Sequence, residues 1–270
     1  MTAEVYLIQC ITNLHVGSGD ANYGIIDKLV QRDTVYNYPT IHASSLKGAL
    51  RERFEKIWKD NLNYVEDIFG KKTNSDTEAG SGNCNFLNAD LLALPVRCSH
   101  KQFALTLCPQ SIGFINGKAK MLTESEILRM PTTIDRLFTN ENPVGDIFLE
   151  DDSIQRAGHS ELINGWTTKD FNPFKKQYAI VEDSKYDTYA ADLPVVARNR
   201  LDENRNLWYE EVVPHQSVFI TYFIPNATVD SNAFADFEKN LSEKNFQVGA
   251  NSSVGYGLCK FHKLTKKEIK

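Results

Sequence analysis

A mostly apolar run near the start of this chain predicts a β-strand. In residues 4–12, Val5 and Leu7 point to one side of an extended chain, while Tyr6 and Ile8 point to the other. Three later apolar runs predict further strands, at residues 89–98, 103–109 and 215–225.

Two segments carry apolar residues at the spacing of a helix. In the first, residues 44–57, one face holds Leu46, Leu50, Phe54 and Ile57. Ser44 or Ser45 is suited to cap its start. In the second, residues 230–244, the apolar stripe consists of Phe234, Phe237 and Leu241.

The order of these elements predicts an α+β fold. Strand, helix, strands, helix and strand form the ferredoxin-like (RRM-like) β-α-β-β-α-β core plan, in a single domain spanning residues 1–270. Residues 195–210 predict a β-hairpin with a polar tip. The mixed pattern of residues 110–193 predicts a large insertion packed beside the core. A sheet of this plan is one platform for single-stranded RNA, although the plan alone does not fix a function.

Composition predicts an ordinary cytoplasmic protein. The chain has 270 residues, of which 41% are hydrophobic and 24% charged. Its five scattered cysteines are expected to be reduced thiols, and neither they nor the six histidines have zinc-ligand spacing. No apolar run is long enough to span a bilayer, and no basic segment precedes the first one as in a secretory signal. We therefore expect no membrane partner.

The net charge of −5 argues against a nucleic-acid binder, which usually has a basic balance. Phosphates, however, respond to the local potential within about 10 Å. An acidic cluster such as residues 150–152 can lie on a face remote from a basic groove. The net charge therefore does not exclude nucleic acid.

A glycine-rich loop, HVGSGDANYGIIDKLVQRD, follows the first strand. Gly17, Gly19 and Gly24 do not have the dinucleotide-binding spacing, and no G-K-[ST] follows for a phosphate loop. Asp27 is a candidate ligand for Mg²⁺ or another divalent metal, or a group that transfers a proton, and His15 is the other candidate acid or base. The alternative for both is a loop residue bonded to backbone.

The start of the first helix is a candidate phosphate site. Free backbone N–H groups and the positive end of the helix dipole there would act with Ser44, Ser45, Lys47 and Arg51. Taken from local sequence alone, an ordinary capped helix with a solvated basic stripe is the favoured alternative.

Two further segments could contact a sugar–phosphate chain. The second glycine loop, Gly249 to Gly257, contains Asn251, Ser252, Gly255 and Tyr256, and it is long for a tight turn. The hairpin carries Arg198 and Arg200 near Trp208 and Tyr209, and arginines with aromatic residues can grip a backbone and stack on bases. The alternative is a surface hairpin whose aromatic side chains return to the core.

These segments resemble a known family, the repeated backbone subunit of type III-B CRISPR effector complexes in the RAMP superfamily. The resemblance rests on the first glycine loop and on PTIHASSLKGALRERF, LPVRCSHKQFALTLCP, ARNRLDENRNLWYEEVVP and GANSSVGYGLCKF, which follow in family order between residues 15 and 261. Residues 110–193 match more loosely, and Lys28-Leu29-Val30 stands where the family often has a proline.

The resemblance implies a ferredoxin-like fold and a filament of identical subunits along a CRISPR RNA, together with other type III-B subunits. It implies that hairpin 195–210 is a thumb that wedges into the duplex of guide and target RNA, and that each subunit cuts target RNA once, with metal. The catalytic aspartate of the family matches Asp27, while His15, Ser44, Ser45 and Lys47 match positions near the RNA. Gly17 and Gly19 would let the RNA approach closely, and 2′,3′-cyclic phosphate ends are expected.

Two other functions stay open from the sequence. The chain could be a non-catalytic RNA-binding scaffold of the same kind of complex, with Asp27 merely capping its loop. Less favoured is a small-molecule hydrolase that uses His15 and Asp27, since nothing in the sequence builds a pocket for it.

Overall fold

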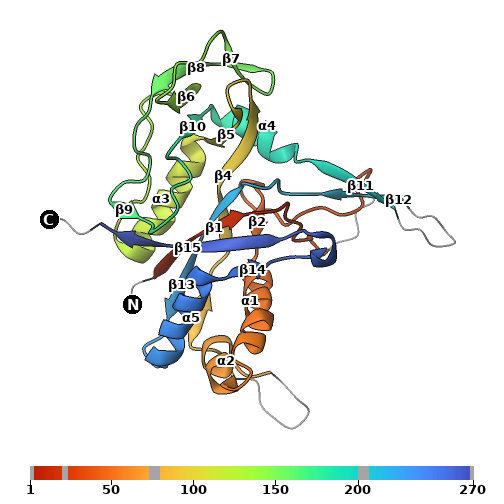
Figure 1. Cartoon of the computed structure of the whole chain (residues 1–270), viewed down its shortest axis with the longest axis vertical. Coiled ribbons are helices and arrows are strands. Elements are labelled where there is room, and N and C mark those ends of the chain that lie inside the picture. The colour runs from red at the N-terminus through yellow and green to blue at the C-terminus, as the bar shows by residue number, and fades with distance from the viewer. Residues whose placement is uncertain (1–2, 20–23, 73–79, 200–206, 268–270) are drawn as a thin grey trace.

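The computed structural model describes residues 3–19, 24–72, 80–199 and 207–267. Over these ranges the chain has an α+β fold, in which one large mixed sheet carries helices and a separate two-stranded hairpin projects from it (Figure 1). None of the helices in these ranges is long and apolar enough to cross a membrane.

The helices are α1 (Ala43–Ile57), α2 (Leu62–Phe69), α3 (Pro109–Thr123), α4 (Asp183–Ala191), α5 (Ser231–Glu243) and the short 3₁₀-helix η1 (Ser252–Val254). The strands are β1 (Glu4–Cys10), β2 (Thr40–Ile41), β3 (Cys84–Phe86), β4 (Ala89–Cys98), β5 (Gln102–Leu107), β6 (Arg136–Thr139), β7 (Ile147–Leu149), β8 (Asp152–Gly158), β9 (Trp166–Thr167), β10 (Gln177–Ile180), β11 (Val195–Asn199), β12 (Leu207–Glu211), β13 (Val218–Pro225), β14 (Asn245–Gln247) and β15 (Leu258–Lys266).

The centre of the sheet has the strand order β15-β1-β13-β4, with every neighbouring pair antiparallel. Strand β1 lies between β15 and β13, so that Leu7 is opposite His262 on one side and Ile220 on the other. Strand β1 is buried on both faces, and its sequence fits this because both faces carry apolar side chains, Val5 and Leu7 on one and Tyr6 and Ile8 on the other.

Both faces of this central sheet are covered in the part of the chain that the structure describes. Tyr6 and Ile8 pack on one face with apolar residues of α1, α2 and α5. Val5 and Leu7 pack on the other face with α3 and with residues 162–180. The open RNA-binding surface that this type of sheet can offer is therefore filled by protein, and a nucleic acid would have to bind at its loops.

Residues 110–193, expected as an insertion beside the core, extend the core sheet itself. Strand β4 turns back into β5, β5 pairs in parallel with β10, and the order then continues β10-β6-β8-β7. Hydrogen bonds rather than packing alone join this region to the core, because a strand edge left open by β5 is completed by β10.

Strands β11 and β12 form an antiparallel hairpin where residues 195–210 were expected to form one. Arg200 lies outside the described residues. Residues 27–28 run along β12: the backbone N–H groups of Asp27 and Lys28 both donate to the carbonyl of Tyr209, at 3.1 and 3.2 Å. The hairpin thus carries part of the first glycine loop along its side.

Candidate nucleic-acid interface

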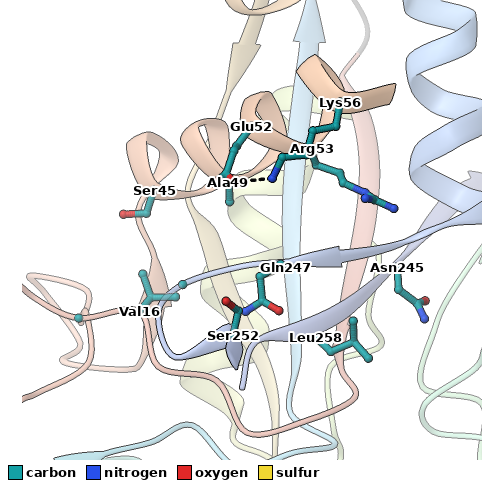
Figure 2. A pocket seen from close by; sticks show the side chains of 12 residues that line it. Val16, Ser45, Ala49, Glu52, Arg53, Lys56, Asn245, Gln247, Ser252 and Leu258 are labelled. Carbon is teal, nitrogen blue, oxygen red and sulfur yellow. Dashed lines mark hydrogen bonds and ion pairs between the residues drawn. The ribbon is translucent and has the colours of Figure 1, made fainter. Parts of the chain in front are cut away.

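A groove of about 760 Å³ lies between helix α1 and the chain around β14 and η1. Figure 2 shows α1 along one wall, with Gln247 and Ser252 on the opposite wall. The lining residues are Val16, Gly17, Ser45, Ala49, Glu52, Arg53, Lys56, Asn245, Gln247, Gly249, Ser252 and Leu258. The structure therefore brings together the first glycine loop, the helix start and the second glycine loop, which are far apart in sequence.

The buried face of α1 decides which basic residues meet this groove. Leu46, Leu50 and Phe54 are buried in the core. Arg53 and Lys56 lie on the groove side, and they were missed because the sequence analysis followed the stripe of Lys47. A helical wheel at 100° per residue separates the two stripes clearly and could have pointed to Arg53 and Lys56.

Lys47 and Arg51 are engaged on another face of α1. The Lys47 Nζ lies 5.7 Å from the centre of the Phe86 ring. The Arg51 Nε donates to Glu55 at 3.0 Å. The structure does not bring these two residues into the groove.

Helix α1 begins at Ala43, before either serine could cap it. His42 is its N-cap and makes no side-chain cap, so the expectation that Ser44 or Ser45 caps the helix is wrong. Both serines lie in the first turn instead. The side chain of Gln31 makes the hydrogen bonds at the start of the helix. Its Oε1 accepts from the His42 N–H at 2.8 Å, and its Nε2 donates to the Ser45 Oγ at 2.9 Å.

His15 joins the two glycine loops from a buried position. It is 3% exposed, and its Nδ1 lies 2.7 Å from the Glu211 carbonyl, to which it donates. Its own carbonyl accepts from Ala250 at 2.9 Å. Gly249, with a φ of 76°, passes so close that a Cβ there would overlap the His15 carbonyl oxygen. The imidazole is thus fixed beneath the groove floor rather than open to it.

The second glycine loop turns on left-handed residues and contacts the hairpin. Asn251, Gly255 and Gly257 all have φ between 64° and 84°. The Arg198 guanidinium lies 4.4 Å from the centre of the Tyr256 ring, a cation–π contact. Ser252 faces the groove. In the first loop, Gly17 lines the groove and Gly19, with a φ of 85°, is exposed.

Asp27 is exposed at the base of the hairpin. Its Oδ2 accepts from the Tyr209 backbone N–H at 2.7 Å, and its own N–H donates back to the Tyr209 carbonyl. The carboxylate therefore has a fixed direction while it stays accessible to solvent. Asp27 itself does not line the groove, and it sits on the hairpin side of the same loop.

A buried glutamate that the sequence analysis did not single out holds these segments together. Glu210 is 0% exposed, and four side chains reach its carboxylate, one from its own strand and three from other segments. The four contacts are Lys28 Nζ at 2.7 Å, Trp208 Nε1 at 2.8 Å, Arg198 Nε at 2.6 Å and Asn251 Nδ2 at 2.9 Å. The residues that contact Glu210 lie 2 to 182 positions from it along the chain, so no local pattern could predict the cluster. Its one sequence signal is the motif LWYEE, which contains Glu210 and forms part of the family resemblance.

Asp27 is the residue at this site that could bind a divalent metal ion. In the ranges that the structure describes, no three His, Cys, Asp or Glu side chains form a group that could hold a metal ion. Mg²⁺ is nevertheless often bound by one or two carboxylates, with substrate phosphates and water completing its shell. The exposed Asp27 carboxylate fits such a role as one ligand among several.

The chain belongs to the RAMP superfamily, whose family model matches residues 7–260. A relative from Pyrococcus furiosus, named CRISPR system Cmr endoribonuclease Cmr4, is 26% identical over 100% of this chain and 97% of its own length. Two solved structures, a type III-B Cmr-beta complex in the apo state and the same type bound to cognate target RNA, contain chains with TM-scores of 0.79 and 0.75. Each is 22% identical, with 97% of both chains covered, and shows a shared fold.

Proposed function

We propose that this chain is a repeated backbone subunit of a type III-B CRISPR effector complex that binds CRISPR RNA and cleaves complementary target RNA at regular intervals. The family membership and the endoribonuclease name of the relative from Pyrococcus furiosus support the assignment. Its partners would be CRISPR RNA, target RNA, copies of itself and other subunits of the complex. The strand order β15-β1-β13-β4, with α1 and α5 on one face, supports a ferredoxin-like assignment for the core.

One observation carries the enzymatic part of the proposal: Asp27 presents an exposed carboxylate at the base of the hairpin, and a backbone hydrogen bond fixes it there. A hairpin that displaces a base pair would kink the target strand beside it. Such a kink aligns a 2′-hydroxyl with its neighbouring phosphate, which is a proximity effect.

The cleavage then follows from this alignment. The 2′-oxygen attacks the adjacent phosphorus as its proton passes to the Asp27 carboxylate. The bond from phosphorus to the 5′-oxygen breaks, and that oxygen takes a proton from water. The products are a 2′,3′-cyclic phosphate and a 5′-hydroxyl end. A divalent cation, when bound with Asp27 as one ligand, would offset negative charge on the phosphate.

His15 has a supporting role in this scheme. Its Nδ1 is committed to the Glu211 carbonyl and its ring is buried, so it orients the first glycine loop rather than exchanging protons with RNA. The same burial weighs against a small-molecule hydrolase, which would need His15 and Asp27 as an open acid–base pair.

A scaffold without catalysis is the second candidate, and one contact favours it. The hydrogen bond from the Tyr209 N–H to Asp27 is what a purely structural aspartate would make. Both functions share the groove, so guide binding does not separate them. The charge of Asp27 does separate them, because a scaffold needs only a hydrogen-bond acceptor for the Tyr209 N–H at this position.

The test is Asp27→Asn in the reconstituted complex with guide and target RNA. Asparagine keeps an acceptor for the Tyr209 N–H but loses the charge, so we expect guide binding to be unchanged and target cleavage to fall by about a hundredfold or more. Asp33→Asn is the matched control, since Asp33 bonds to the N–H groups of Val35 and Tyr36 in the same segment. Cleavage by Asp27→Asn at the wild-type rate would leave the scaffold function, with cutting done elsewhere.

A further inference from the structure

The side chain of Arg32 contacts four oxygen acceptors from three parts of the chain. Its Nη1 donates to the carbonyls of Asn37 and Ala190, at 2.9 and 2.8 Å. Its Nη2 donates to the carbonyl of Ala191 at 3.3 Å and forms an ion pair with the Glu211 carboxylate. The Arg32 side chain is 16% exposed and that of Glu211 is 4% exposed, so this is a buried pair with its hydrogen bonds made.

Two of these acceptors are carbonyl oxygens at the C-terminal end of helix α4. Ala190 and Ala191 are its last residues, and the last carbonyls of a helix have no partner within it. The last turn of α4 has no basic residue of its own. Arg32, 158 residues away along the chain, supplies the cation that the negative end of the helix dipole favours.

Through Glu211, Arg32 is also connected to the strand that holds the candidate catalytic residue Asp27. Besides pairing with Arg32, the Glu211 carboxylate accepts from the Val30 N–H at 3.0 Å, and the Glu211 carbonyl accepts from His15. Glu211 is two residues after Tyr209 on β12, and the Tyr209 N–H holds Asp27. A shift of Glu211 would therefore move the strand that sets the direction of Asp27.

Helix α4 is itself fastened to the strands of residues 110–193. The Tyr189 hydroxyl donates to Asp152 at 2.5 Å and lies 3.3 Å from the Leu149 carbonyl oxygen. Lys185 pairs with Asp135 at 2.8 Å. Arg32 is thus one contact through which this region can hold the hairpin base in place. The chain itself also runs from α4 into β11, and the Val212 N–H donates to the Pro194 carbonyl at 2.9 Å.

We infer that Arg32 is a positioning residue for target cleavage, which ties helix α4 to the strand that orients Asp27. The inference rests on the proposed function and gives residues 110–193 a part in it. A planar guanidinium can reach the helix end and the carboxylate together, whereas the single ammonium of a lysine cannot meet four acceptors in this geometry.

The experiment compares Arg32→Lys with wild type in the reconstituted complex. We expect the cleavage rate at saturating target to fall by about tenfold or more, with guide binding and the target concentration for half-maximal rate unchanged. Tyr189→Phe keeps Arg32 but loosens the far anchor of α4, so we expect a smaller loss of the same kind. Lys267→Gln is the control, because it removes an exposed ion pair with Glu161 beyond the end of β15 that lies away from the hairpin (Figure 1), and it should cut at the wild-type rate.

The outcomes separate the two proposals. Wild-type rates for both Arg32→Lys and Tyr189→Phe would overturn the positioning role. So would a loss of guide binding and melting temperature in Arg32→Lys that matches its loss of rate, because that indicates a general structural defect. If Arg32→Lys does not assemble, Tyr189→Phe decides alone. A target left intact by the wild-type complex would refute the proposed function, and the role of Arg32 with it.

Discussion

At the scale of single residues, the carboxylate of Glu210 is the centre of the interface. Burial by itself raises the pKa of Glu210, but the hydrogen bonds from Lys28 and Trp208 and the charges of Lys28 and Arg198 outweigh it and lower the pKa below its ordinary value. Glu210 is therefore ionised in the folded chain, and removing its charge would leave Lys28 and Arg198 without their counterion.

We expect Glu210→Gln to destabilise the isolated chain at pH 7 by less than the about 3–5 kcal/mol lost when a fully buried ion pair is broken, because the Lys28 side chain is 51% exposed while that of Arg198 is 18% exposed. Because the folded pKa is lowered, this stabilisation is complete above the ordinary glutamate pKa of about 4.3 and is lost as the pH falls through the folded value. Urea unfolding at several pH values should show the two proteins converging in acid.

Glu55→Gln is the matched control for that measurement. Glu55 pairs with Arg51 and Lys72, and its side chain is 28% exposed. A pair this close to solvent is worth less than about 1 kcal/mol. Equal losses in Glu210→Gln and Glu55→Gln would contradict the central place given to Glu210.

At the scale of elements, helix α1 presents two polar faces with different surroundings. One carries Lys47 against Phe86, and the other carries Arg53 and Lys56 along the groove. The apolar stripe of α1 predicted which side is buried, but not which polar stripe meets the second glycine loop. That choice depends on where β14 and η1 pack, and local periodicity holds no information about a partner about two hundred residues away.

The two faces make a prediction about guide binding. Replacing both Arg53 and Lys56 by glutamine should weaken guide RNA binding irrespective of base sequence. Each lost phosphate contact should reduce the slope of log affinity against log salt by roughly 0.7–0.9. The double variant should therefore lower the slope by about 1.5, as measured by titration at several salt concentrations.

Lys47→Gln is the comparison on the other face of the same helix. With its Nζ against Phe86, Lys47 is expected to leave the salt slope nearly unchanged. A large change in slope for Lys47→Gln, with none for the double variant, would place the guide on the opposite side of α1.

At the scale of the whole molecule, the central sheet and residues 110–193 form one body. One of their contacts is a stack of Phe171 on His262, with ring centres 4.2 Å apart. Burial, with the charge of Lys260, lowers the pKa of His262 from its ordinary value to about 4. The imidazole is therefore neutral in the folded chain at neutral pH.

This neutral histidine makes the fold sensitive to acid. A group whose folded pKa is lowered stabilises the fold fully above its unfolded pKa of about 6.5, and that stability is lost as the pH falls towards 4. We expect His262→Gln to flatten the fall in unfolding free energy between pH 7 and pH 5. Lys260→Gln should narrow the pH range over which the unfolding free energy falls, since it removes a charge that lowers the pKa of His262. Identical pH profiles for the wild type and both variants would contradict the lowered pKa of His262.

By itself the sequence determined the class of fold, the strand of residues 4–12, the helix of residues 44–57 and the segments that meet RNA in the proposed function. These depend on local periodicity and on short sequence motifs. Only the tertiary structure decided that α3 closes the sheet face, that His15 is buried, that Arg53 rather than Lys47 meets the groove, and that Glu210, Glu211 and Arg32 join the segments around Asp27. The physical reason is that a buried carboxylate is stable only where its cations gather, and these come from positions up to 182 residues away.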